Sequence, residues 1–161
     1  MYWLIIFEKG IWFGLAAIGF AILFNVPLRT LKMIFIIGAV GGLIKSLMLL
    51  AGMNIILASL AGAIAVGIIS ISAAHNKHAP PMAFAIPSVI PMVPGAFAYK
   101  MMLGLMKLSG ELPADAYNQV LADTINNGLK ATFILLSLAL GVAIPILITR
   151  KESVKKIEDE N

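Results

Sequence analysis

The chain has 161 residues, of which 60% are hydrophobic and 12% are charged. A soluble domain carries about 25% charged residues, so this composition predicts an integral membrane protein and excludes an ordinary soluble domain. The formal net charge is +4, but the basic residues do not form a stripe with aromatic side chains, so we expect no nucleic-acid partner. The absence of cysteine excludes disulfides, thiol chemistry and Cys-based metal sites.

Long apolar runs predict an all-α polytopic membrane protein of about five transmembrane helices, in a single domain that covers residues 1–151. The first three spans are expected at about residues 11–24, 31–50 and 55–74, and Asn25-Val26-Pro27 ends the first of them. Glycine and alanine recur at a spacing of four in these spans, as in GAVGG, and this spacing favours close packing of helices.

The fourth apolar segment, at about residues 82–108, contains three prolines and a glycine: Pro87, Pro91, Pro94 and Gly95. Proline removes a backbone donor and clashes with the preceding helical turn, so this segment should be broken or sharply bent. Broken helices survive in membranes only against protein or a water-filled cavity, and transporters use them to bind solutes near the midplane. The alternative is a proline-kinked helix that serves packing alone.

The helical pattern from residue 114 to residue 148 is too long for one bilayer core. We therefore expect an interfacial segment at 114–124, a bend at Asn126-Asn127-Gly128, and a fifth span at about 129–148. Asn126 and Asn127 belong to a polar cluster at the entrance of this span, which is either an interfacial cap or part of a site. A charged tail follows at 152–161.

Cations stand within or near the spans, whereas no acidic residue lies well inside one. Lys45 either extends to the nearer membrane surface or faces a polar interior, and Lys100 follows the proline-rich run. Such cations, together with half-helix ends, would favour a solute that carries a carboxylate. The spans contain no motif of an intramembrane hydrolase, so we expect no enzyme activity and no cofactor. His75 and His78 lack further ligands, so no metal site is expected.

The distribution of basic residues predicts the topology. With five spans, one side of the membrane collects seven cations, and the other collects Lys9 and Lys107, with Lys100 debatable. The positive-inside rule then places the N-terminus outside and the C-terminus in the cytoplasm. The seven are Arg29, Lys32, Lys77, Arg150, Lys151, Lys155 and Lys156.

Two runs, GFAILFNVPLRTL at residues 19–31 and IPSVIPMVPGAFAYKMM at residues 86–102, carry a resemblance to the threonine/serine exporter family. The chain resembles the small-subunit type, which matches the C-terminal half of fused exporters, and it is similar to the small subunit of the succinate exporter. The resemblance implies export of L-threonine and L-serine or of succinate-like dicarboxylates. It also implies a separate large membrane subunit.

We therefore interpret the chain as one subunit of a secondary exporter in the cytoplasmic (inner) membrane, with the lipid bilayer, a large subunit and a small carboxylate-bearing solute as partners. A homo-oligomer stays open, and the alternative function is a membrane scaffold that does not transport. The candidate solute-binding residues are Pro87, Pro91, Pro94, Gly95, Lys100, Asn126, Asn127 and Lys45.

Overall fold

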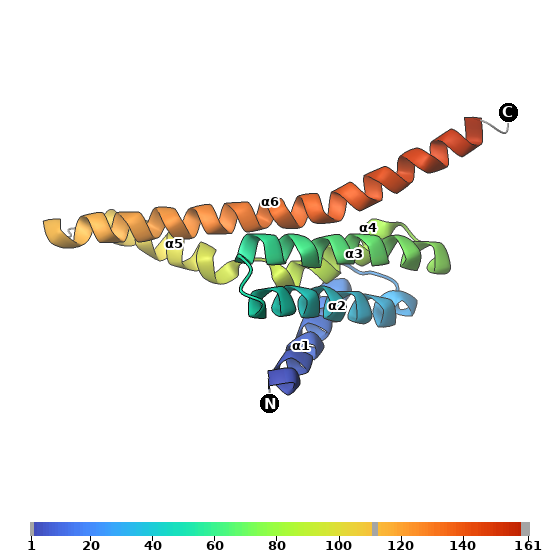
Figure 1. The fold of residues 1–161 in the computed structure, drawn as a ribbon, viewed down its shortest axis with the longest axis horizontal. Coiled ribbons are helices and arrows are strands. Elements are labelled where there is room, and N and C mark those ends of the chain that lie inside the picture. Colours follow the sequence, from blue (N-terminus) through green and yellow to red (C-terminus); the bar gives the residue numbers. More distant parts are fainter. Residues whose placement is uncertain (1, 111–112, 159–161) are drawn as a thin grey trace. The chain divides into compact units, whose positions relative to one another are not determined.

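The computed structural model describes the backbone of residues 2–110 and 113–158, and no β-strand occurs in these segments. Helices make up most of both segments (Figure 1). They are α1 (Tyr2–Leu23), the short 3₁₀ helix η1 (Leu28–Thr30), α2 (Leu31–Leu50), α3 (Ile55–Lys77), α4 (Pro81–Val89), the 3₁₀ helix η2 (Ile90–Met92), α5 (Gly95–Leu108) and α6 (Ala114–Glu158).

Within the described residues, four helical stretches are long and apolar enough to cross a membrane: Ile6–Leu23, Leu28–Leu50, Ile55–Lys77 and Asp115–Thr149. The helices on either side of the proline-rich break qualify together as a fifth span. The protein is therefore an all-α polytopic membrane protein. The prediction of about five spans, the fourth of them broken, is confirmed.

Short turns with left-handed residues end the first three long helices. The backbone φ angle is positive at Asn25 (56°), Gly52 (81°) and His78 (49°). In each case the amide of the next residue bonds back to a carbonyl five residues earlier, as in a Schellman motif. Asn54 then caps α3, because its side chain accepts a hydrogen bond from the Ile56 amide at 3.0 Å. Asn, Gly and His tolerate this conformation better than β-branched residues do.

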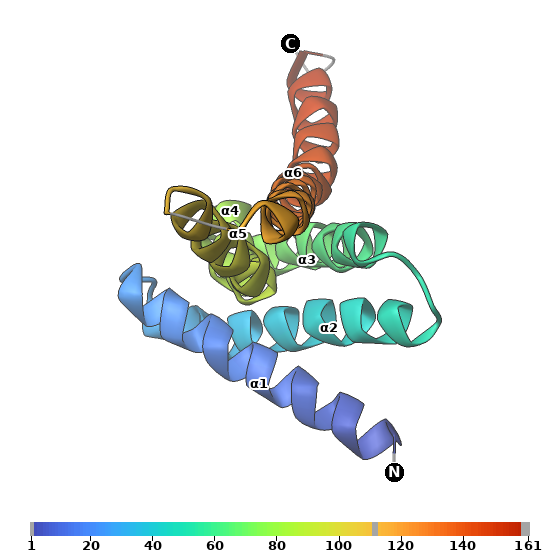
Figure 2. The ribbon, with the colours of Figure 1, turned by 90° about the vertical axis from the view of Figure 1, so that its left-hand side faces the viewer.

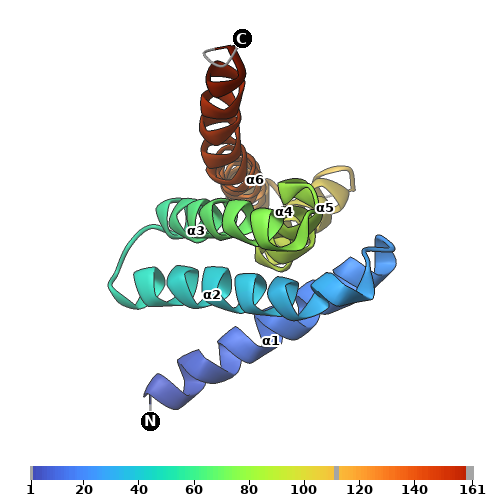
Figure 3. The same ribbon diagram turned by 90° about the vertical axis from the view of Figure 1, so that its right-hand side faces the viewer.

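The chain forms two compact units. One contains the residues up to Met92 together with those from Ser137 onward, and the other contains Val93–Leu136. In the first unit α2 is central, since it packs against α1, α3 and α4. Helices α2 and α3 run side by side, and α1 crosses α2 (Figures 2 and 3).

Glycines let the helices of the first unit approach closely. A Cβ atom at Gly38 would lie 2.7 Å from the Ala17 side chain on α1. A Cβ atom at Gly62 on α3 would lie 2.8 Å from the backbone oxygen of Gly41 on α2. The GAVGG run on α2 therefore serves contacts with both neighbouring helices, which is the ordinary meaning of small residues at this spacing.

The second unit pairs α5 with the first part of α6. A side chain at Gly104 on α5 would collide with Thr124 on α6, and a Cβ atom at Gly128 would lie 2.9 Å from the Met101 sulfur. Helix α6 passes through Asn126-Asn127-Gly128 without interruption, so the bend expected there does not break the helix. The same helix continues to Glu158, so it includes the first part of the charged tail.

We predict that Gly62→Ala destabilises the protein by about 1–3 kcal/mol, because the new methyl group would press on backbone rather than on a movable side chain. Gly19→Ala is the matched control, since no atom lies within 4 Å of a Cβ atom at that position. Thermal unfolding of both variants in detergent measures the difference. Equal midpoints for the two variants would contradict close packing of α2 against α3.

Candidate functional site

The break between α4 and α5 leaves a short stretch of backbone outside regular helix. Helix α4 contains Pro87 and ends at Val89, η2 adds one turn of 3₁₀ helix, and α5 begins only at Gly95. The amides of Phe97 and Ala98 bond to the Pro94 carbonyl, which starts the new helix. In a continuous helix the Met92 carbonyl would accept a hydrogen bond from the amide of the residue four positions later in the chain.

The Met92 carbonyl accepts a hydrogen bond from a cation on another helix. The ammonium of Lys45, on α2, donates to this oxygen at 2.9 Å. Lys45 is half-buried and lies within the Leu28–Leu50 span. A cation at the carboxyl end of a helix also interacts favourably with the helix dipole. Lys45 therefore stabilises the end of η2 rather than extending freely to the membrane surface.

The Met92 side chain fixes the position of this carbonyl. Met92 is only 1% exposed. A Cβ atom at Gly41 would lie 3.3 Å from its terminal methyl group, and one at Gly62 would lie 3.1 Å from its sulfur. The slot for Met92 therefore exists because both helices carry glycine there. Nearby on α4, the buried Ser88 hydroxyl donates to the Ile34 carbonyl at 3.3 Å and ties α4 to α2.

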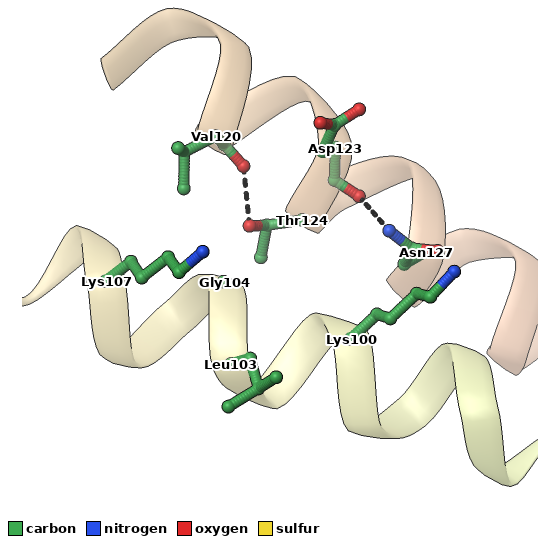
Figure 4. Close-up of a pocket in the computed structure, with 8 residues that line it drawn as sticks. All are labelled: Lys100, Leu103, Gly104, Lys107, Val120, Asp123, Thr124 and Asn127. Atoms are coloured by element: carbon green, nitrogen blue, oxygen red, sulfur yellow. Dashed lines mark hydrogen bonds between the residues drawn. The ribbon is translucent and has the colours of Figure 1, made fainter. Parts of the chain in front are cut away.

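A polar pocket lies within the second unit, between α5 and the first part of α6 (Figure 4). Its volume is about 380 Å³. The Asn127 side chain donates to the Asp123 carbonyl at 2.7 Å, and the Thr124 hydroxyl donates to the Val120 carbonyl at 2.6 Å (Figure 4). The lining residues are Lys100, Leu103, Gly104, Lys107, Val120, Asp123, Thr124 and Asn127.

Two ammonium groups and one carboxylate give this pocket a net positive charge. No ion pair joins Lys100, Lys107 and Asp123 to each other or to any other residue in the part of the chain that the structure describes. Beyond the pocket, the Lys130 ammonium lies 5.8 Å from the centroid of the Phe97 ring, a favourable cation–π contact. The pocket can therefore attract a small anion.

The candidate solute-binding residues named from the sequence lie at different places in the structure, some at the break and some at the α5–α6 pocket. Lys45 bonds at the break, where Pro87 and Pro94 are buried. Lys100 and Asn127 line the α5–α6 pocket. Asn126 is exposed and is not among the residues that line it.

Two further positions at the break differ in what surrounds them. Pro91 lines a separate cavity of about 290 Å³ with Lys9, Trp12, Phe13 and Ala16. Gly95 is exposed, and a Cβ atom there would meet nothing within 4 Å, so packing does not require glycine at this position.

Sequence reasoning used Lys107 only for the topology and did not select it, or the residues named next, as part of a site. Lys107 and Asp123 line the pocket, and Pro145 lies inside α6, where a Cβ atom at Gly67 would be 3.2 Å from its ring. The spacing of two lysines in the sequence could have indicated the pocket. Lys100 and Lys107 are seven residues apart and so share one face of a helix.

The two histidines of the α3–α4 region lie beside a further cavity. His75 and His78 line a cavity of about 630 Å³, and the His75 Nδ1 atom lies 2.9 Å from the Ile71 carbonyl oxygen. No group of three or more potential metal ligands occurs among the described residues. The functional candidates are therefore the break and the α5–α6 pocket.

Comparisons with known proteins agree with the resemblance noted in the sequence. Residues 9–148 match the family described as "Threonine/Serine exporter, ThrE". An uncharacterized protein of Haemophilus influenzae is 33% identical over 136 residues, which is 84% of this chain and 44% of that relative. The chain thus spans less than half the length of that protein. No solved structure matches the chain. Because the family match covers most of its length, the chain belongs to the threonine/serine exporter (ThrE) family.

Proposed function

We propose that this chain is the small membrane subunit of a secondary exporter for small carboxylate-bearing metabolites. The solutes would be L-threonine and L-serine or succinate-like dicarboxylates, moved by alternating access together with a large membrane subunit. Family membership supports the transporter role. The large subunit is what the resemblance to small-subunit exporters implies.

The Lys45–Met92 hydrogen bond is the observation that carries this proposal. This bond joins the ammonium of Lys45, on the α2 span, to the Met92 carbonyl at the break in the fourth segment, at a distance of 2.9 Å. Charged groups at membrane depth are rare, and by default they mark solute or ion pathways. Discontinuous helices with free carbonyls form the solute sites of many secondary transporters. The prolines would shape this site, and Gly95 would start its second half-helix.

The α5–α6 pocket would supply a second place where a carboxylate is attracted. Lys100 and Lys107 give it two ammonium groups, and Asn127 adds an amide at its edge. We include Asn126 in this polar region because it stands beside Asn127 in the chain. A large subunit would cover the break, since unsatisfied backbone groups in lipid are unfavourable by several kcal/mol each.

We propose an inner-membrane location with the N-terminus outside and the C-terminus in the cytoplasm, and predict that reporters fused at the two ends report opposite sides. The reason is the excess of cations on the predicted cytoplasmic side. A phosphatase active only outside and a fluorescent protein that folds only inside measure the two positions. Both ends on one side would mean that the broken pair does not act as a full span.

We predict that replacing both Pro91 and Pro94 by Ala lowers export at least about tenfold, which corresponds to about 1.4 kcal/mol. Alanine restores the missing backbone donors, so the two half-helices can join into one regular helix and close the site. The measurement is efflux of L-threonine and of succinate from cells, each normalised to the amount of membrane-inserted protein.

Pro113→Ala provides the matched control for the double variant. Pro113 is exposed and precedes α6, where its carbonyl accepts the amides of Ala116 and Tyr117, and alanine offers the same carbonyl. Export by this variant should equal that of the parent. If the double variant also exports at the parent rate, the break serves packing only and the scaffold function becomes the better account.

A further inference from the structure

The charge of Lys45 has no counter-charge within the described residues. Its ammonium makes one hydrogen bond, to the neutral Met92 carbonyl, and joins no ion pair there. A lysine ammonium has three donors, so two remain without a protein acceptor in the described chain. Charged groups inside membrane spans pair with one another or with backbone carbonyls, so the Met92 carbonyl is one normal partner for Lys45. The two remaining donors of the ammonium can still take a further acceptor.

A carboxylate would be a better partner than the carbonyl that Lys45 now holds. The bond from the Lys45 ammonium to the Met92 carbonyl is already charge-assisted on the donor side, whereas a carboxylate adds a full opposite charge on the acceptor side. A carboxylate that reaches Lys45 would therefore compete with the Met92 oxygen. Losing Lys45 would in turn leave that oxygen without its partner, at the point where the helix is already broken.

We propose that Lys45 is the carboxylate anchor of the solute site, and that the Met92 carbonyl occupies it until a solute arrives. Solute binding then releases η2 from α2 and allows the break to rearrange. This inference rests on the proposed export function and adds a coupling step to it. The ligand class is any small solute with a free carboxylate, whether an amino acid or a dicarboxylate.

The chain is well suited to a direct test because it contains no cysteine. Val93→Cys places a single thiol beside Met92, at a position where the native side chain is 44% exposed. The rate of its reaction with a maleimide, in membranes of the host cells so that any partner is present, reports how open the break is. The variants Lys45→Met, Lys45→Gln and Lys45→Arg are each combined with this thiol.

Without added solute, we expect Lys45→Met to react at least about threefold faster than the parent, because its side chain has no donor for the Met92 carbonyl. Lys45→Gln keeps an amide donor on a shorter side chain, so its rate should lie between those of the parent and Lys45→Met. With saturating L-threonine or succinate, the parent should accelerate to a rate similar to that of Lys45→Met, while the neutral variants should not change. Lys45→Arg should keep a slow basal rate, since it retains the charge. The two solutes, added separately, show which carboxylate class the anchor accepts.

Leu28→Cys is the control, because Leu28 is 80% exposed and lies away from the break, in η1. Its reaction rate should be the same in all backgrounds. If the Val93→Cys thiol reacts slowly in both neutral variants and accelerates when solute is added, Lys45 is not the carboxylate anchor. The anchor is also overturned if either solute is exported while the thiol in the parent background never changes its reaction rate. If solute changes the reaction rate of the thiol in the parent background but no efflux is measured, the export function is contradicted, whereas the role of Lys45 as a carboxylate anchor is supported.

Discussion

The broken fourth segment depends on one constraint: backbone polar groups in a membrane need partners. Proline removes donors from this segment, and the Met92 carbonyl finds its partner in the Lys45 ammonium, at 2.9 Å. That bond requires α2, α3 and η2 to lie close together. Gly41 and Gly62 permit this approach, because any larger residue would displace Met92 or the facing backbone. The glycine-rich packing of the bundle and the break therefore belong to one arrangement.

In the proposed mechanism, the same constraint links the break to transport. A carbonyl bonded to a cation is satisfied, yet the bond can be exchanged, because a carboxylate brings an opposite charge that the neutral carbonyl lacks. Lys45 would then bind solute and hold the resting conformation with the same group. The α5–α6 pocket would gather the anion with Lys100 and Lys107. Membership of the threonine/serine exporter family supports a transport role for the chain.

Sequence patterns predicted the helical class and the broken segment because both follow from local chemistry: apolar runs and prolines. The partner of Lys45 could not be read this way, since Met92 is 47 positions away and only the packing of α2 fixes the lysine's direction. The sequence pattern also did not predict that α6 continues without a break through Asn126-Asn127-Gly128. Asn127 bonds within its own helix, to the Asp123 carbonyl, and Gly128 packs against Met101, so residues that usually interrupt helices are accommodated by their contacts.

The most direct test of the central claim is solute efflux from liposomes that contain purified components. The chain is reconstituted alone and together with a large membrane subunit that co-purifies with it, in vesicles loaded with labelled L-threonine or succinate. We predict efflux only when both proteins are present. Full-rate efflux from the chain alone would contradict the two-component account, and no efflux from the assembled pair with either solute would contradict the exporter itself.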